Sequence, residues 1–160
     1  MADQVLIVDM TRLMNESAPA QRIKARADAL RVDLNQQIDT RRQELRDEEQ
    51  EMVKLRETLE REAFNERAAA FEQRVRELKR DARQLSDNLQ RTLRRAEEQL
   101  RRATTPILIN IMSERGARVM LEKRDVVLSA NNLDVTEEAI RRLNAADLQI
   151  EVNIEGQDAE

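Results

Sequence analysis

The sequence predicts a mostly α-helical chain in which a long antiparallel coiled-coil hairpin joins a small body that contains β-strands. Charged residues make up 38% of the 160 residues and aromatic residues only 1%, against about 25% charge in an ordinary globular domain. Apolar residues recur at heptad spacing through the middle of the chain, and short β-branched runs lie near both ends. Few large side chains are present to fill a compact core, whereas paired helices need only an apolar seam.

The residue types that are absent exclude most catalytic chemistry. The chain has no Cys and no His, so it has no thiolate nucleophile, no imidazole base and no zinc cluster of the usual kind. Its two glycines, Gly116 and Gly156, cannot build a phosphate-binding loop. No apolar run approaches the roughly 20 residues of a membrane span. We therefore expect no enzyme, no cofactor and no metal.

The N-terminal segment predicts a strand followed by two helix starts. Residues 5–8 form an apolar, β-branched run that is typical of a buried strand. Asp9 is in position to cap a short helix over residues 10–16. Ser17 is expected to accept from free backbone amides at the start of the next helix, where Pro19 fits the first turn.

The second half of the long helical region has a regular heptad seam. Apolar residues alternate steps of three and four, with one step of four repeated at Leu89, which is a stutter that locally unwinds a supercoil. This regularity predicts a coiled coil. The seam positions are Phe64, Ala68, Phe71, Val75, Leu78, Ala82, Leu85, Leu89, Leu93, Ala96, Leu100, Ala103 and Ile107.

The first half has a less regular seam. Arg41 and Glu48 occupy positions where the heptad calls for apolar residues, so we expect a loose or partly hydrated contact. The apolar positions are Ile23, Ala27, Leu30, Leu34, Ile38, Leu45, Met52, Leu55 and Leu59.

The two seams do not join in one register. The step from Leu59 to Phe64 is five residues, which fits neither three nor four, so we prefer a hairpin to a continuous rod. A turn is expected near residues 58–62, with the tip near 58–64 and Thr58 or Asn65 capping the second arm. The arms would span residues 18–105, each about 60 Å long at 1.5 Å per residue.

The segment after the arms predicts a helix end and a β-hairpin. Pro106 would kink or restart the second helix, and it is either a hinge or only a bend. Gly116 is placed for the left-handed residue that ends a helix. Residues 118–121 and 126–128 would pair as a hairpin around a polar turn.

The C-terminal region predicts a helix, a strand and a tail. Asp134 or Thr136 would cap a last helix whose inner face includes Ala139, Ile140 and Leu143. Apolar residues alternate with polar ones from Leu148 to Ile154, which predicts a half-exposed strand. Residues 156–160 are expected to be a disordered acidic tail.

The body, residues 1–17 and 106–155, is too small to bury much core alone. Its strands are apolar on both faces, and such strands belong to sheets that are covered on both sides. We therefore expect a homo-oligomer in which a second subunit supplies one cover. The predicted oligomerisation residues are Val5, Ile7, Val119, Leu121, Val126, Leu128, Ile140 and Leu143.

The net charge of −4 conceals an uneven distribution. Residues 20–103 contain 21 Lys/Arg and 18 Asp/Glu, and residues 64–103 contain 11 and 7. Basic charge without interleaved aromatic residues is weak evidence for nucleic-acid binding. We interpret most of these charges as a solvated helix surface and expect no nucleic-acid partner.

The order of elements resembles the Skp (OmpH-like) family of periplasmic chaperones over nearly the full length. The opening ADQVLIVDM at residues 2–10 is similar to the start of a mature family member, and Glu62-Ala63-Phe64 sits where the family often has a similar segment. The most specific likeness is VVLSANNLDVTEEAIRRLN at residues 126–144, similar to the family's closing signature.

The resemblance implies a jellyfish-like homotrimer in the periplasm, with a cavity between helical arms. The arms would hold unfolded outer-membrane proteins without ATP and prevent their aggregation. A cleaved signal peptide would precede the mature chain, and we expect that Met1 before Ala2 marks such a mature form. The acidic pI of 5.2 departs from the many basic members of the family.

Client contact is expected near the hairpin tip, with weak contact to anionic lipid as a further partner. The two Phe side chains either touch clients or pack in the seam, and the basic ones either attract anionic groups or pair with neighbouring carboxylates. The expected client-binding residues are Met52, Leu55, Leu59, Phe64, Arg67, Phe71, Arg74, Lys79 and Arg80, and Arg76 belongs with the basic group.

Two other functions fit the same pattern. A prefoldin-like cytosolic holdase would share the mechanics with a different body. A structural coiled-coil stalk or adaptor would need a continuous rod instead of a hairpin.

Overall fold

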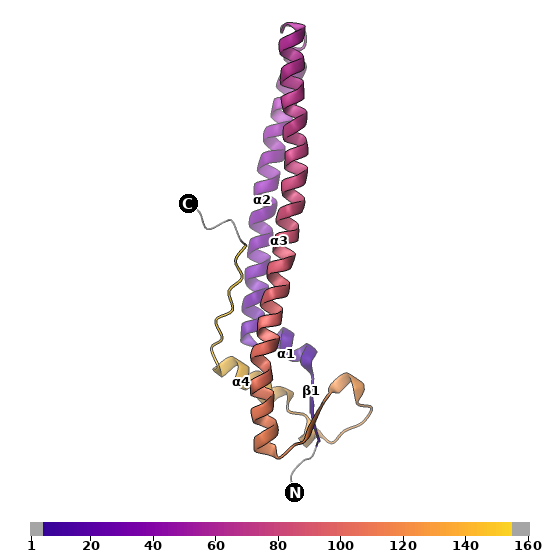
Figure 1. Cartoon of the computed structure of the whole chain (residues 1–160), viewed down its shortest axis with the longest axis vertical. Helices are drawn as coiled ribbons and strands as arrows, with labels where there is room; N and C mark the ends of the chain where they lie inside the picture. Colours follow the sequence, from indigo (N-terminus) through magenta and orange to yellow (C-terminus); the bar gives the residue numbers. More distant parts are fainter. Residues whose placement is uncertain (1–4, 155–160) are drawn as a thin grey trace. The chain divides into compact units, whose positions relative to one another are not determined.

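The computed structural model describes residues 5–154. The expectations for residues 2–4 and for the tail at 156–160 lie outside the described residues. The prediction of a mostly α-helical fold with a small sheet is confirmed. The elements in order are β1 (Val5–Val8), α1 (Met10–Glu16), α2 (Ala18–Leu55), α3 (Arg61–Arg115), β2 (Val119–Glu122), two short 3₁₀ turns (Lys123–Asp125 and Asn131–Leu133) and α4 (Thr136–Ala145) (Figure 1).

The chain forms two compact units. One unit, which we call the body unit, contains Met1–Ala27 and Thr92–Glu160, and the other, the hairpin unit, contains Asp28–Arg91. The body unit holds both strands, α1, α4 and the ends of the two long helices. The hairpin unit holds the rest of α2 and α3 with the turn between them.

The two strands pair in parallel, with Val5 opposite Val119 and Val8 opposite Glu122. The predicted β-hairpin over residues 118–128 is therefore wrong. Residues 126–128 form no strand, and the exposed fractions of Val127 and Leu128 are 94% and 90%. The polar segment after β2 forms a 3₁₀ turn at Lys123–Asp125. The partner of β2 is β1, near the N-terminus.

Strand β1 is covered within the single chain. Leu6, Ile7 and Val8 are all buried, although they point to opposite faces of the strand. The edge of β1 that does not pair with β2 is also partly hydrogen-bonded. There the Val135 amide donates to the Ile7 carbonyl at 2.9 Å. The inference that β1 needs a second subunit to cover one face is wrong, because Leu6, Ile7 and Val8 are already buried in the single chain.

The two helix starts near the N-terminus are capped differently from each other. Asp9 accepts from the Arg12 amide at 2.9 Å, as predicted for α1. Ser17 does not cap α2, because its hydroxyl is buried and has no hydrogen-bond partner. Asn144 replaces it, since its side-chain oxygen accepts from the Ala18 amide at 2.7 Å. The first turn of α2 is thus tied to the end of α4.

The long helices form the predicted hairpin and not a rod. Helix α2 ends at Leu55 and α3 begins at Arg61, so the turn lies about two residues earlier than expected. The Thr58 and Leu59 amides donate to the Leu55 carbonyl at 3.1 and 2.9 Å, which satisfies the end of α2 without Gly or Pro. Neither predicted cap of α3 is correct, because the Thr58 hydroxyl faces the Leu55 carbonyl and Asn65 lies inside the helix.

Helix α3 passes through Pro106 and ends at a glycine. Its bounds show that the predicted restart at Pro106 does not occur. Gly116 has a φ of 66°, as predicted. The Ala117 amide donates to the Met112 carbonyl at 2.8 Å, and the Gly116 amide to the Ser113 carbonyl at 3.2 Å, which is the Schellman arrangement.

The segment after α4 is not the predicted strand. Residues 148–154 have no helix or strand assignment. Their alternation is nevertheless real, because Val152 and Ile154 are buried while Glu151 and Asn153 are exposed. Within residues 5–154 no strand pairs with this segment. Its carbonyls accept from side chains of α2 and α3.

Candidate functional site

The seam of the hairpin unit loses burial toward the turn. Leu30, Leu34 and Leu89 are buried, whereas every apolar seam residue between Leu34 and Leu78 is half-exposed. The expected client-binding residues Met52, Leu55, Leu59, Phe64 and Phe71 all belong to this half-exposed group. Phe64 and Phe71 occupy seam positions and keep accessible surface, and their contact with clients stays a prediction.

A cavity of about 280 Å³ opens beside this half-exposed seam. Its apolar wall includes Leu45 and Ile38 of α2 and Phe71 and Val75 of α3. Charged side chains also line it, three of them basic and one acidic: Arg42, Arg46, Lys79 and Glu49. A mostly apolar cavity with a few charged groups can take an apolar side chain whose neighbours are polar.

The two charges that interrupt the seam are paired across the hairpin. Arg41 donates to Asp81 of α3 at 3.1 Å from both terminal nitrogens. Glu48 accepts from Arg74, and only 15% of its side chain is exposed. The predicted loose contact is thus a polar contact that is satisfied by partners on the opposite helix.

The basic candidates near the turn are largely engaged within the chain. Arg67 contacts Glu51 at 3.2 Å, and Arg80 contacts Asp81 at 3.2 Å. These bonds, first from Arg41 and then from Arg80, lower the pKa of the Asp81 carboxyl. Arg74 and Arg76 also have carboxylate partners, Glu48 and Glu72. Lys79 instead lines the cavity described above.

The predicted oligomerisation residues divide into two groups. Ile7, Ile140 and Leu143 are buried in the chain itself. The remaining five keep accessible surface in this single chain, and four of them lie in β2 or in the loop after it; they are Val5, Val119, Leu121, Val126 and Leu128.

A polar network joins the elements of the body unit. Asp134 accepts from the Thr136 amide at 3.0 Å and from the Lys123 ammonium at 2.7 Å. The Thr136 hydroxyl donates to the same carboxylate at 2.6 Å and accepts from the Asp9 amide at 2.9 Å. Burial raises the pKa of Asp134, but these hydrogen bonds outweigh it, so the net pKa is lowered. The N-cap of α4 is Val135, so neither predicted cap, Asp134 or Thr136, holds that position. Asp134 still accepts from the first helical amide, one residue before the cap.

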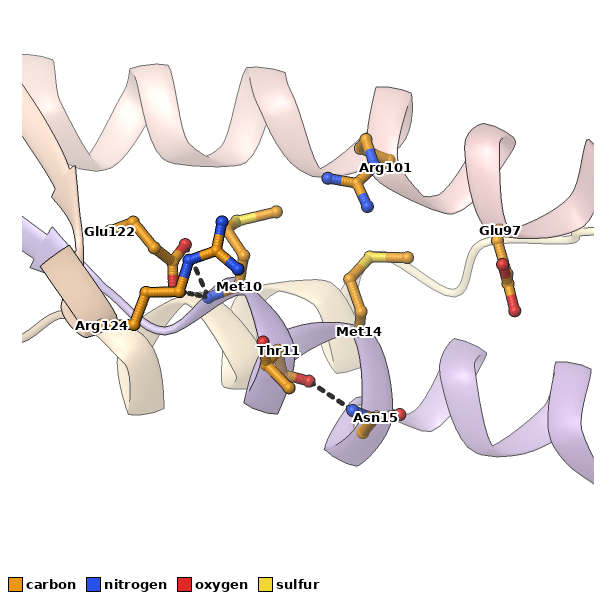
Figure 2. A pocket seen from close by; sticks show the side chains of 8 residues that line it. All are labelled: Met10, Thr11, Met14, Asn15, Glu97, Arg101, Glu122 and Arg124. Atoms are coloured by element: carbon orange, nitrogen blue, oxygen red, sulfur yellow. Dashed lines mark hydrogen bonds between the residues drawn. The ribbon is translucent and has the colours of Figure 1, made fainter. Parts of the chain in front are cut away.

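A second pocket, of about 390 Å³, lies in the body unit (Figure 2). Met10 and Met14 of α1 form one wall, and Arg101 of α3 faces them. Its two arginines are matched by two glutamates, and Glu122 already accepts from the Met10 amide at 3.3 Å. The pocket has no net charge to select an ion.

Sequence reasoning missed the bonds between the C-terminal segment and the helices. Arg22 donates to the Leu148 carbonyl at 3.0 Å, and Arg26 donates to the Val152 carbonyl at 3.4 Å. The alternating residues from 148 to 154 were the available signal. Nothing in their spacing indicates side-chain partners more than 120 residues earlier in the chain.

The fold defines a class of protein, namely a coiled-coil hairpin whose ends are joined by a two-stranded parallel sheet. Residues 4–143 match the family described as outer membrane protein (OmpH-like). The chain belongs to this family, as the sequence predicted.

A solved structure has the same fold. It is the crystal structure, at 2.83 Å resolution, of a proposed outer membrane chaperone (OmpH-like) from Caulobacter crescentus CB15. The TM-score is 0.92 at 17% identity, over 99% of this chain and 94% of that chain. No curated protein matches the chain. Within residues 5–154, no helix combines the length and apolarity that crossing a membrane requires.

Proposed function

We propose that this protein is an ATP-independent holdase chaperone of the periplasm that binds unfolded outer-membrane proteins with its helical hairpin and prevents their aggregation. The observation that carries the proposal is the half-exposed seam of the hairpin unit, with the cavity beside Phe71. Family membership supports the assignment, as does the likeness in fold to a proposed outer membrane chaperone.

The hairpin is suited to weak contacts spread over a long surface. A strand of an outer-membrane barrel presents an apolar residue at every second position. Each such residue that packs against a half-exposed seam position adds to the binding free energy. The gain is roughly 25 cal/mol per Å² of apolar surface that is buried. Met52 adds a flexible, polarizable side chain that adapts to different partners. Many such contacts hold a client without imposing one structure on it, and none of them requires nucleotide hydrolysis.

We further propose that three copies assemble through the body unit. The side chains of Val127 and Leu128 are almost fully exposed, and Val119 and Leu121 of β2 are also exposed. Exposed apolar side chains, where they gather on one surface, mark an interaction site. A rod-like stalk has no support in this chain, because the helices reverse direction at residues 56–60.

Dilution of a urea-unfolded outer-membrane barrel provides the test. Light scattering by the barrel should fall to the baseline near one trimer per client, with no nucleotide present. Sedimentation at several concentrations should give the mass of three chains. Equal aggregation with and without the protein would refute the holdase activity, and a monomer at all concentrations would refute the trimer.

A further inference from the structure

The C-terminal segment, residues 148–154, is held by its main chain. Arg22, Arg26 and Thr92 donate to the carbonyls of Leu148, Val152 and Asn153 at 3.0, 3.4 and 3.4 Å. These donors lie on α2 and α3, and all of the participating residues belong to the body unit. Figure 1 shows the segment running beside α2. Contacts to carbonyls do not depend on the sequence of the segment that is held.

The side chains of the same segment alternate in burial. The exposed fractions of Val152 and Ile154 are 4% and 2%, whereas Glu151 and Asn153 are exposed. The alternation extends back through half-exposed Ile150 and exposed Gln149. A period of two is the pattern of an extended chain that lays one face on a surface.

Main-chain bonds combined with sites for alternate side chains are a general way of binding an extended peptide. A strand from an unfolded outer-membrane barrel has the matching chemistry, because apolar and polar residues alternate along it. The surface that holds residues 148–154 is therefore equipped for such a strand. The segment that fills it in this chain has neither helix nor strand structure to fix it there.

We propose that Arg22, Arg26 and Thr92 mark a peptide-binding site for extended segments with alternating apolar residues, and that residues 148–154 occupy this site as an internal competitor. A client strand displaces the segment and takes over its carbonyl bonds. This inference rests on the proposed function, since it names where part of an unfolded barrel is bound. The site is separate from the half-exposed seam, because its residues belong to the body unit.

Displacement can be followed with a single label, since the chain has no native Cys. Asn153→Cys places a fluorophore on an exposed position of the segment. A synthetic peptide that alternates Val or Leu with Ser or Gln should lower the anisotropy of the label as the segment is released. A peptide of the same composition with its apolar residues grouped should leave the anisotropy unchanged.

Two neighbouring substitutions separate competition from a bracing role. Val152→Asp places a charge on the buried face and releases the segment, whereas Asn153→Asp adds the same charge on the exposed face. Removing an internal competitor raises the apparent affinity by the reciprocal of the fraction of sites that it left free. If the segment fills about four fifths of the sites, V152D should bind the alternating peptide about fivefold more tightly. N153D should bind like the parent chain.

The donors supply the second arm of the test. Arg26→Ala introduced into V152D should weaken binding of the alternating peptide, because a carbonyl contact is lost. If V152D binds the peptide no better than N153D, the segment is a brace and the inference is wrong. If an unfolded barrel is kept soluble at saturation while the label at residue 153 does not respond, the inference fails and the holdase function stands. If the barrel aggregates regardless, the holdase function itself fails.

Discussion

The body unit and the hairpin unit use apolar residues in different ways. Of the twenty apolar side chains buried among residues 5–154, sixteen lie in the body unit and four in the hairpin unit. The hairpin unit nevertheless contains many apolar seam residues, most of them half-exposed. One unit thus uses its apolar surface for its own fold, while the other keeps part of it accessible. The difference shows how a chain with few large side chains can have a core and still present a binding surface.

The largest expected effect comes from truncation of a core residue in the body unit. Leu143 of α4 is fully buried, so Leu143→Ala should lower the free energy of unfolding by about 3 kcal/mol through lost burial and a residual cavity. Leu45→Ala, in the half-exposed seam, should cost about 1 kcal/mol. Urea unfolding followed by circular dichroism, at one protein concentration, measures both. Equal losses would remove the contrast between the two units.

A smaller effect is expected from the polar network of the body unit. Asp134→Ala should lower the free energy of unfolding by about 2 kcal/mol, because the Thr136 amide and the Lys123 ammonium lose a common acceptor. Asp81→Ala in the hairpin unit should have a much smaller effect, since its arginine partners are exposed and can be hydrated. The same urea titration compares the two variants, and an equal effect would show that the hairpin pairs are structural.

Acid should act mainly on the body unit. Burial raises the pKa of Glu138, but hydrogen bonds from Arg115 and Arg142 outweigh it and lower the net pKa, as the network does for Asp134. A carboxyl with a lowered folded-state pKa stabilises the fold above its unfolded pKa of about 4. That contribution is lost as the pH falls through the folded pKa. The urea concentration at the unfolding midpoint should therefore decrease when the pH is lowered below about 4.5. In the D134N/E138Q variant this midpoint should change less with pH.

The smallest expected effect concerns client binding by the hairpin unit. Phe71→Ala should weaken binding of an unfolded barrel about fivefold, or about 1 kcal/mol, because the cavity loses its only aromatic wall. Val53→Ala provides the matched control, since the Val53 side chain is exposed on α2 outside the cavity. Titration of client aggregation against chaperone concentration measures both. If F71A holds clients as well as V53A, the cavity is not a client contact.

Local signals in the sequence predicted the elements whose partners are close in the chain. The break in register after Leu59 predicted the hairpin, and Asp9 and Gly116 predicted helix ends that the structure confirms. The parallel pairing of β1 with β2 could not be predicted in this way, because hydrophobic alternation carries no information about a partner 114 positions away. The apolar run at 126–128 was misleading for the same reason, since apolar character alone does not distinguish a strand from an exposed loop.

The site was predictable to a similar degree. The loose seam expected for the first half is consistent with half-exposed Met52, Leu55 and Leu59, whereas the half-exposure of Phe64 and Phe71 in the regular second half was not predicted. The partners of Arg41 and Glu48 were not identified, because they lie on the opposite helix 40 and 26 residues later. The carbonyls of residues 148–154 accept from side chains of α2 and α3. In the sequence alone, those side chains are equally suited to contact with solvent.

The parallel pairing of β1 and β2 also has a consequence for the order of folding. Val5 cannot meet Val119 until 114 further residues have been synthesised and brought back. Closing that length as a flexible loop carries an entropic cost that grows with the number of residues. The hairpin is built from contacts closer in sequence, and once formed it brings the two strand segments together. We therefore expect the arms to fold first and the sheet to close last, so that a nascent chain acquires its hairpin before its N-terminal strand finds a partner.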